Sequence, residues 1–80
     1  PKVQIIRMRR VPFIDSTGIH NLTTLVETNN EKGTEVILSG VTPKVQKQLL
    51  KAKLHKVLGS KNFCNNIDEA LQRAKELLDK

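Results

Sequence analysis

The stretch Phe13-Ile14-Asp15-Ser16-Thr17-Gly18-Ile19 separates two segments with different hydrophobic periods. The run that precedes it, Val3 to Met8, is short, apolar and rich in β-branched residues, as is typical of a strand. The residues that follow it are apolar at helical spacing: Ile19, Leu22, Leu25 and Val26. We therefore expect a turn from a strand to a helix here, at the carboxyl end of a strand. In open α/β sheets, that edge is where ligands and partners usually bind.

This turn carries a carboxylate, two hydroxyl groups and a glycine: Asp15, Ser16, Thr17 and Gly18. Ser16 or Thr17 can cap the helix by accepting a hydrogen bond from a backbone N–H that has no partner inside the helix. The partial positive charge at a helix start also favours an anion, such as a phosphate carried on a hydroxyl. The same residue types serve as simple helix caps, so a purely structural role stays open beside the regulatory one.

Strand and helix patterns continue along the chain. After the first strand, the expected elements are a helix over 17–31, a strand over 35–40, a helix over 43–52, a brief strand over 61–64 and a helix over 67–79. This βαβα(β)α order predicts an α/β fold with a parallel sheet, because parallel strands are joined through helical crossovers. The second strand has an unbroken apolar centre, Val36 to Leu38, and we expect it to be buried on both faces.

Local signals mark the ends of these helices. Thr42 is a favoured cap and Pro43 suits the first helical position. Asn66, with Glu69 three residues on, resembles a capping box, and Gly33 suits a helix terminator. The helical period predicts two further apolar sides: Val45, Leu49, Leu50 and Ala52 in one helix, and Ile67, Ala70, Leu71, Ala74, Leu77 and Leu78 in the other.

The length and charge of the chain narrow the class of protein. Eighty residues form one small domain. Fourteen Lys and Arg against eight Asp and Glu give a formal net charge of +6, which permits an anionic partner. Proteins that bind single-stranded nucleic acid need stacking aromatic rings. Since the chain has two Phe and no Tyr or Trp, we predict that it does not bind nucleic acid.

The residues needed for enzymatic or metal chemistry are scattered. His20, His55 and Cys64 do not form a metal-ligand pattern, and a single cysteine cannot form an internal disulfide. We find no set of nucleophile, base and orienting group, and no glycine-rich phosphate loop. No run of about 18 apolar residues is present and no signal peptide opens the chain. We therefore predict a soluble segment without catalytic residues, metal or cofactor.

A basic surface is predicted on the expected helix over 43–52 and the residues that follow it, since no acidic residue occurs from Thr42 to Lys61. Its members are Lys44, Lys47, Lys51, Lys53, Lys56 and Lys61. Such a run is either an ordinary solvated face or a docking surface for anionic lipid or an acidic protein.

Three motifs resemble the STAS domain, the fold shared by anti-anti-sigma factors and the cytoplasmic C-terminal regions of SulP-type anion transporters. They are Val-Pro-Phe-Ile-Asp-Ser-Thr-Gly-Ile over 11–19, Leu-Ser-Gly-Val-Thr-Pro over 38–43 and Asn-Ile-Asp-Glu-Ala-Leu over 66–71. The segment 7–22 is most similar to the transporter branch. The resemblance implies that residues 1–80 form the C-terminal part of a STAS domain, and that the N-terminal strands and first helix of the full domain precede Val3.

The resemblance also implies a function. The chain is expected to be a non-catalytic regulatory and interaction domain of a transporter for sulfate or a related anion, at the cytoplasmic face of the inner membrane. Its candidate partners are the transporter's own membrane domain, another copy, a cytoplasmic protein, a nucleotide and an anionic lipid surface. The alternative is a stand-alone anti-anti-sigma factor, in which Thr17 matches the phosphorylated residue and Asp15 the aspartate that assists it. Hydrophobic spans upstream of the chain would favour the transporter.

Overall fold

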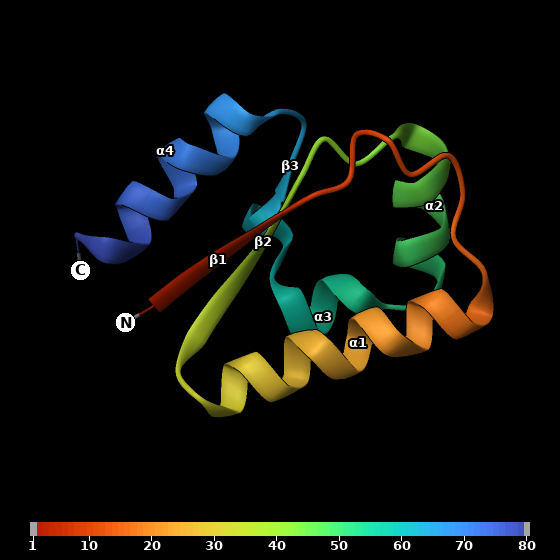
Figure 1. Ribbon diagram of the computed structural model, residues 1–80, viewed down its shortest axis with the longest axis horizontal. Helices are drawn as coiled ribbons and strands as arrows, with labels where there is room; N and C mark the ends of the chain where they lie inside the picture. The colour runs from red at the N-terminus through yellow and green to blue at the C-terminus, as the bar shows by residue number, and fades with distance from the viewer. Residues whose placement is uncertain (1, 80) are drawn as a thin grey trace.

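The computed structural model describes residues 2–79, in which strands and helices alternate as the sequence predicts (Figure 1). The elements are β1 (Lys2–Arg7), α1 (Ser16–Glu31), β2 (Thr34–Ser39), α2 (Pro43–Lys51), α3 (Leu54–Leu58), the 3-10 helix η1 (Ser60–Asn62), β3 (Phe63–Cys64) and α4 (Ile67–Leu78). Sequence reasoning does not predict α3, because a helix of five residues is too short to display a helical period.

The three strands form a parallel sheet in the order β1-β2-β3, so β2 is central. The ladder pairs Ile5 with Ile37 and Arg7 with Ser39. The side chains of Val36, Ile37 and Leu38 are 0% exposed, which confirms that the centre of this strand is buried on both faces. Crossover helices cover both faces of a parallel sheet, so its central strand can be apolar throughout.

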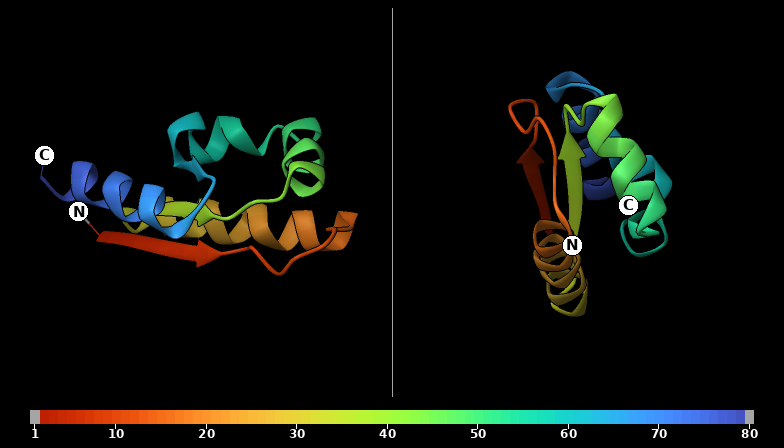
Figure 2. Two further views of the ribbon diagram at one scale, coloured as in Figure 1. Left: turned by 90° about the horizontal axis from the view of Figure 1, so that it is seen from above. Right: turned by 90° about the vertical axis from the view of Figure 1, so that its right-hand side faces the viewer.

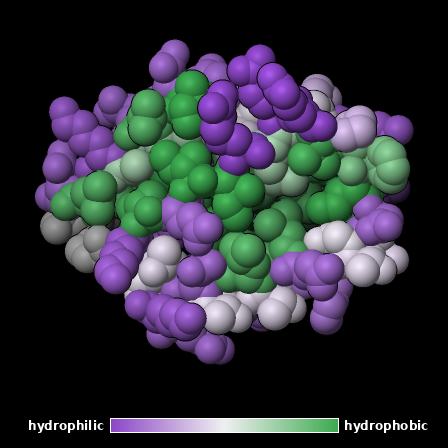
Figure 3. All heavy atoms as spheres, in the orientation of Figure 1, coloured by the Kyte–Doolittle hydropathy of each residue, from purple (hydrophilic) through white to green (hydrophobic). Residues whose placement is uncertain are grey.

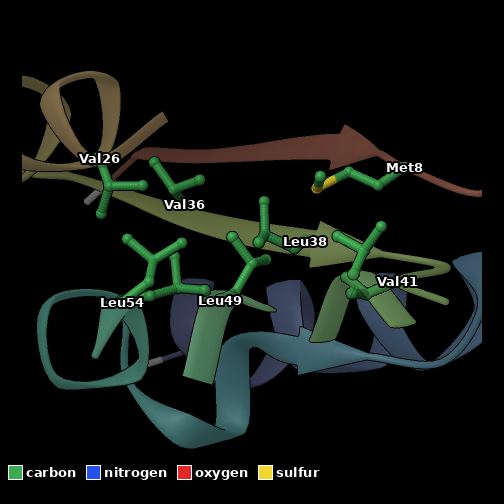
Figure 4. Packing of buried hydrophobic residues seen from close by; sticks show 9 residues of the cluster. Met8, Val26, Val36, Leu38, Val41, Leu49 and Leu54 are labelled. Atoms are coloured by element: carbon green, nitrogen blue, oxygen red, sulfur yellow. The ribbon is translucent and has the colours of Figure 1, made fainter. Parts of the chain in front are cut away.

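The helices α1, α2 and α3 cover one face of the sheet (Figure 2). Figure 4 shows how side chains from these helices meet Val36 and Leu38 of β2, with Met8 closing the cluster at one end. The buried members are Met8, Val26, Val36, Leu38, Val41, Val45, Leu49, Leu54 and Leu58. We call this cluster the large core.

The helix α4 covers the opposite face. There Ile37 of β2 packs with Cys64, Ala70, Ala74 and Leu77, and Val3 and Ile5 of β1 pack against them. We call this cluster the small core. The side chains of β1 therefore alternate as the sequence predicts, because Val3 and Ile5 face α4 while Ile6 and Met8 face the large core.

The predicted apolar sides of the helices are too wide. Leu25 is 36% exposed, Leu50 42%, Leu71 55% and Leu78 53%, and Ala52 is also exposed. Each helix packs on the sheet along one narrow line, so residues next to the buried stripe turn away from it. Val26, one position after Leu25, is 0% exposed for the same reason.

Several element boundaries also differ slightly from the predicted ones. Met8 lies just beyond the end of β1, although its N–H still donates to the Ser39 carbonyl at 2.7 Å. The helix starts agree with their signals: Thr42 accepts a hydrogen bond from the Val45 N–H, and Asn66 accepts one from the Glu69 N–H. Gly33 follows α1 with a φ of +78°, which confirms its role as a left-handed terminator.

Candidate functional site

The cap of α1 is Asp15. Its backbone is extended, with φ −93° and ψ 178°, and its Oδ1 accepts a hydrogen bond from the Gly18 N–H at 2.7 Å. The prediction that Ser16 or Thr17 caps this helix is wrong. Both residues already lie inside α1, and a capping residue must precede the first helical residue with an extended backbone.

Gly18 is required by a close contact within this turn. A Cβ atom at this position would lie 2.8 Å from Cγ1 of Ile14 and 3.2 Å from Oδ1 of Asp15. A side chain here would therefore push against both the segment that leads into α1 and the capping carboxylate. The side chains of Asp15, Ser16 and Thr17, by contrast, are exposed.

The sequence predicts a strand-to-helix turn at this position, but in the structure the turn does not directly follow a strand. Strand β1 ends at Arg7 and α1 begins at Ser16, and an extended connection joins them (Figure 1). The Ile14 N–H in this connection donates to Oε1 of Gln48 in α2 at 3.1 Å, so α2 helps to hold the turn in position. Phe13 beside it is 60% exposed.

The side chains of all six lysines of the predicted basic surface are exposed. Lys44, Lys47 and Lys51 lie at helical spacing along α2, and Lys53 and Lys56 lie at the start of α3 and within it. Lys61 is in η1 and lines a hollow that also contains the carboxylates of Glu69 and Glu76. The structure therefore groups five of the lysines on α2 and α3, and sets the sixth beside acidic residues.

A buried polar network connects α3, β2 and α4. Asn62 is 2% exposed, and its Nδ2 donates to the Leu58 carbonyl and to Oε2 of Glu35, both at 3.0 Å. Its Oδ1 accepts a hydrogen bond from Nε of Arg73 at 2.8 Å. Arg73 also forms an ion pair with Glu76 at 3.4 Å. Sequence reasoning misses this network, because nothing in the local pattern around Asn62 indicates a buried amide.

Cys64 lies on the same side of the molecule, in the small core, and is 5% exposed. Burial, with a further contribution from the charge of Glu69, raises the pKa of its thiol. A thiol with a raised pKa is a weak nucleophile at neutral pH. Within residues 2–79, no group of three or more His, Cys, Asp or Glu residues is arranged to hold a metal ion.

Three arginines lie at the end of β1 and just after it, and sequence reasoning uses them only as part of the family motif over 7–22. Arg7 and Arg9 line a hollow with Ser39, Gly40 and the start of α4. Arg7, Arg9 and Arg10 together line a second hollow next to it. Figure 3 shows strongly hydrophilic residues gathered over this end of β1 and the β3–α4 connection, beside an apolar area over β1 itself. The sequence does show that the three arginines follow the first apolar strand and that Ser39 follows the apolar centre of the second.

Comparison with known proteins gives a consistent family. A model of the STAS domain matches residues 1–70. A sulfate transporter family protein from Wolinella succinogenes has a similar structure, with a TM-score of 0.93 and 41% identity over 100% of this chain and 66% of that one. The STAS domain of a SulP transporter from Vibrio cholerae gives a TM-score of 0.91 and 32% identity over 99% of this chain and 62% of that one.

No curated protein sequence matches the chain. In residues 2–79, none of the helices has the length and apolar character needed to span a membrane. The chain spans about two thirds of the length of the two solved structures. Its motifs, its parallel sheet and these matches together show that the chain belongs to the STAS domain family.

Proposed function

We propose that this chain is part of a non-catalytic regulatory and interaction domain of a SulP-type transporter of sulfate or a related anion. The observation that carries the proposal is the similarity of the whole chain to two proteins described as a SulP transporter STAS domain and a sulfate transporter family protein, at 32% and 41% identity. Because the chain spans about two thirds of each of them, the transport activity of the whole protein is part of the proposal.

In this role the domain lies at the cytoplasmic face of the inner membrane. Its first partner is the transporter's own membrane domain, and it acts by changing how that domain moves its anion. A second copy or a cytoplasmic protein would bind through the turn at Asp15, Ser16, Thr17 and Gly18, in which the first three side chains are exposed. The transported anion itself does not need to touch the domain for this regulation.

The basic surface is the second part of the proposal. We propose that the lysines on α2 and α3 meet anionic lipid headgroups next to the transporter. This proposal is supported by the position of the lysines. Lys44, Lys47 and Lys51 are exposed at helical spacing on α2, and Lys53 and Lys56 follow at α3. Each lysine close to an anionic membrane contributes about 1 kcal/mol, and salt screens the attraction.

A stand-alone anti-anti-sigma factor is the second candidate function. The observation that favours it is that Thr17 is exposed in the first turn of α1, where a kinase could reach its hydroxyl, and Asp15 lies beside it as the cap. A phosphate on Thr17 would add nearly two negative charges at a helix start and alter the binding of a partner.

Uptake of radiolabelled sulfate tests the transporter role. Cells would express the intact gene, or the same gene with the segment of this chain deleted, and immunoblots of the membrane fraction would confirm equal amounts. We expect the deletion to change uptake while the protein remains in the membrane. Unchanged uptake would contradict a regulatory role, and an intact gene that encodes no hydrophobic spans would favour the anti-anti-sigma factor.

Vesicle co-sedimentation tests the lipid surface separately. The triple variant Lys44→Gln, Lys47→Gln, Lys51→Gln should lose about 100-fold in affinity for phosphatidylserine vesicles, from about 1 kcal/mol per lysine. A matched variant, Lys2→Gln, Lys32→Gln, Lys75→Gln, removes the same charge from exposed positions outside α2 and α3. Equal losses in both variants, or equal binding to neutral phosphatidylcholine vesicles, would reduce this surface to an ordinary solvated face.

A further inference from the structure

A hollow of about 150 Å³ opens where β1 and β2 end and α4 begins. The side chains of Arg7, Arg9 and Ser39 line it on the sheet side, and Asn65, Asn66 and Ile67 line it on the helix side. Figure 1 shows that the ends of both strands and the β3–α4 connection lie together there. The hollow lies well away from the turn at Asp15, which belongs to the other end of the β1–α1 connection.

The register of the sheet puts a guanidinium group next to a hydroxyl group at this position. Ile5 and Ile37 are ladder partners and both face α4 in the small core. Two residues further on, Arg7 and Ser39 are also ladder partners. Since side chains alternate along a strand, both of them point to the same face as Ile5 and Ile37, beneath the start of α4.

Ser39 is 97% buried, since its exposed fraction is 3%. None of the side-chain hydrogen bonds among residues 2–79 involves its hydroxyl. Among residues 2–79, the fully buried side-chain atom without a hydrogen-bond partner is Nδ1 of His55, so the Ser39 hydroxyl is not sealed inside the protein. This hydroxyl lines the hollow, so a group that occupies the hollow could accept its hydrogen bond.

The positive charge around the hollow is not neutralised by the protein. Among residues 2–79, the ion pair of Arg73 with Glu76 does not involve Arg7 or Arg9, and those two arginines take part in none. No acidic residue lines the hollow. Glu69, in the first turn of α4, instead accepts a hydrogen bond from the Asn65 N–H at 3.2 Å.

The start of α4 adds donors on the opposite side. The first N–H groups of a helix have no partner inside it and carry partial positive charge. The side chain of Asn66 accepts a hydrogen bond from the Glu69 N–H at 2.9 Å. The N–H groups of Ile67 and Asp68 are left without a bond inside the helix. Two guanidinium groups, one buried hydroxyl and the helix start therefore converge on one small space.

We propose that this hollow is a binding site for a single tetrahedral oxyanion, namely phosphate or sulfate. Arg7 and Arg9 supply charge-assisted hydrogen bonds, for which the fork of the guanidinium group matches two anion oxygens. Ser39 donates its hydroxyl proton to a third oxygen. The volume of about 150 Å³ is small beside the 300–1,000 Å³ of pockets for drug-sized ligands, so it accommodates one such group and no whole nucleotide.

The oxyanion can be a free ion or the phosphate of a nucleotide. In the second case the remainder of the nucleotide would extend into the neighbouring hollow of about 250 Å³, which Arg7 and Arg9 also line, together with Arg10. The site goes beyond the proposed transporter role and does not depend on it, because its argument uses the local geometry alone. It would bind the anion equally in an anti-anti-sigma factor.

An NMR titration of the ¹⁵N-labelled full chain tests the proposal. Sodium sulfate, sodium phosphate, adenosine monophosphate and sodium chloride are added in separate arms at constant ionic strength. We expect saturable shifts of the amide signals of Ser39, Gly40 and Ile67 with sulfate and phosphate and none with chloride. Affinity for adenosine monophosphate at least about tenfold above that for phosphate would identify a nucleotide as the source, and equal affinity would identify a free ion.

Variants separate a built site from general attraction to a positive surface. Arg7→Gln and Arg9→Gln should each weaken oxyanion binding by about tenfold or more, in line with the loss of a charge-assisted pair. Ser39→Ala should weaken it by about threefold or more. Arg10→Gln is the matched control in the sulfate and phosphate arms, because it removes the same charge from the same segment but lines only the neighbouring hollow.

Three results would overturn the proposal. One is the absence of saturable shifts with either oxyanion in the folded wild-type chain. Another is equal shifts with chloride, and the third is an equal loss of binding in Arg10→Gln and Arg7→Gln. If Arg7→Gln fails to fold because Arg7 belongs to β1, the comparison of Arg9→Gln and Ser39→Ala with Arg10→Gln decides instead.

Discussion

The two faces of the sheet are covered in different ways. On one face, α1, α2 and α3 enclose the large core, whose nine buried members are all apolar. On the other face, α4 alone covers the small core, which has five buried members, three of them Cys or Ala. The face with one helix also holds the buried Asn62 network and the hollow at Arg7. Where fewer side chains are available to fill the space, polar groups and an open hollow occupy it.

The largest expected effect is the difference between two neighbouring core residues. Leu38→Ala should cost about 2–5 kcal/mol of the free energy of unfolding, toward the upper end, because Leu38 is enclosed by three helices. Ile37→Ala should cost about 2–3 kcal/mol, because α4 alone covers it and can move toward the cavity.

Urea unfolding of both variants measures this difference. Leu71→Ala serves as the control and should change stability by no more than about 0.5 kcal/mol, because Leu71 is 55% exposed. Equal losses for Leu38→Ala and Ile37→Ala would show that the two faces are equally rigid. That result would contradict the expected difference between the large core and the small core.

The polar network gives the next largest effect. Asn62→Leu should cost about 1–3 kcal/mol, because it leaves the Leu58 carbonyl and Nε of Arg73 without their partner in a buried place. Arg73→Lys keeps the charge but removes the bond from Nε, so it should cost less. Thermal unfolding followed by circular dichroism compares them. If Asn62→Leu were as stable as the wild type, the network would not contribute to holding α4 on the sheet.

The helix caps on the two faces should be similar in energy. Asp15→Ala removes the cap of α1 and Asn66→Ala the cap of α4, and each should cost about 0.5–2 kcal/mol. Ser16→Ala is the control for α1 and should stay within about 0.5 kcal/mol, since Ser16 is exposed and does not cap. A larger loss for Ser16→Ala than for Asp15→Ala would reverse the assignment of the cap.

Substitutions at Thr17 distinguish the two candidate functions with little change in stability. The side chain is exposed, so Thr17→Ala and Thr17→Glu should each change the free energy of unfolding by no more than about 0.5–1 kcal/mol. In a transporter domain, both variants should give the same sulfate uptake, because no phosphate is being imitated. Opposite effects of alanine and glutamate in uptake or in a sigma-factor reporter assay would favour the phosphorylation switch.

The thiol of Cys64 gives the smallest effect. Burial raises the pKa of Cys64 in the folded chain, so the unfolded chain ionises first as the pH rises. The contribution to stability is therefore complete below the pKa of the unfolded thiol and is lost as the pH rises from there toward the folded value. Unfolding measured from neutral to alkaline pH should show this decline in the wild type, and Cys64→Ala should show a weaker one. Identical profiles would contradict it.

Much of the fold follows from local sequence patterns. The apolar run at 36–38 predicts a buried strand and is 0% exposed at all three positions. The signals at Thr42 and Asn66 predict helix starts that the hydrogen bonds confirm. These predictions succeed because hydrogen bonds at helix ends and the period of side chains along a strand depend on residues close together in the chain.

The candidate site is predicted only in part. The sequence identifies the exposed turn from Asp15 to Gly18, but it assigns the cap to the wrong residue. It also predicts one continuous basic surface, whereas Lys61 lies beside Glu69 and Glu76. Those carboxylates come from α4, which follows Lys61 in the chain and folds back over it.

What the sequence alone determined was therefore the order and type of the main elements and the family motifs. What only the tertiary structure decided is which distant residues meet: Arg7 with Ser39 through the register of the sheet, and Asn62 with Arg73 through the packing of α4. Neither pairing leaves a trace in local periodicity. Each exists because burying both faces of β2 brings the strand ends and α4 together. The polar side chains at those points then bind one another, as Asn62 and Arg73 do, or line a hollow, as Arg7 and Ser39 do.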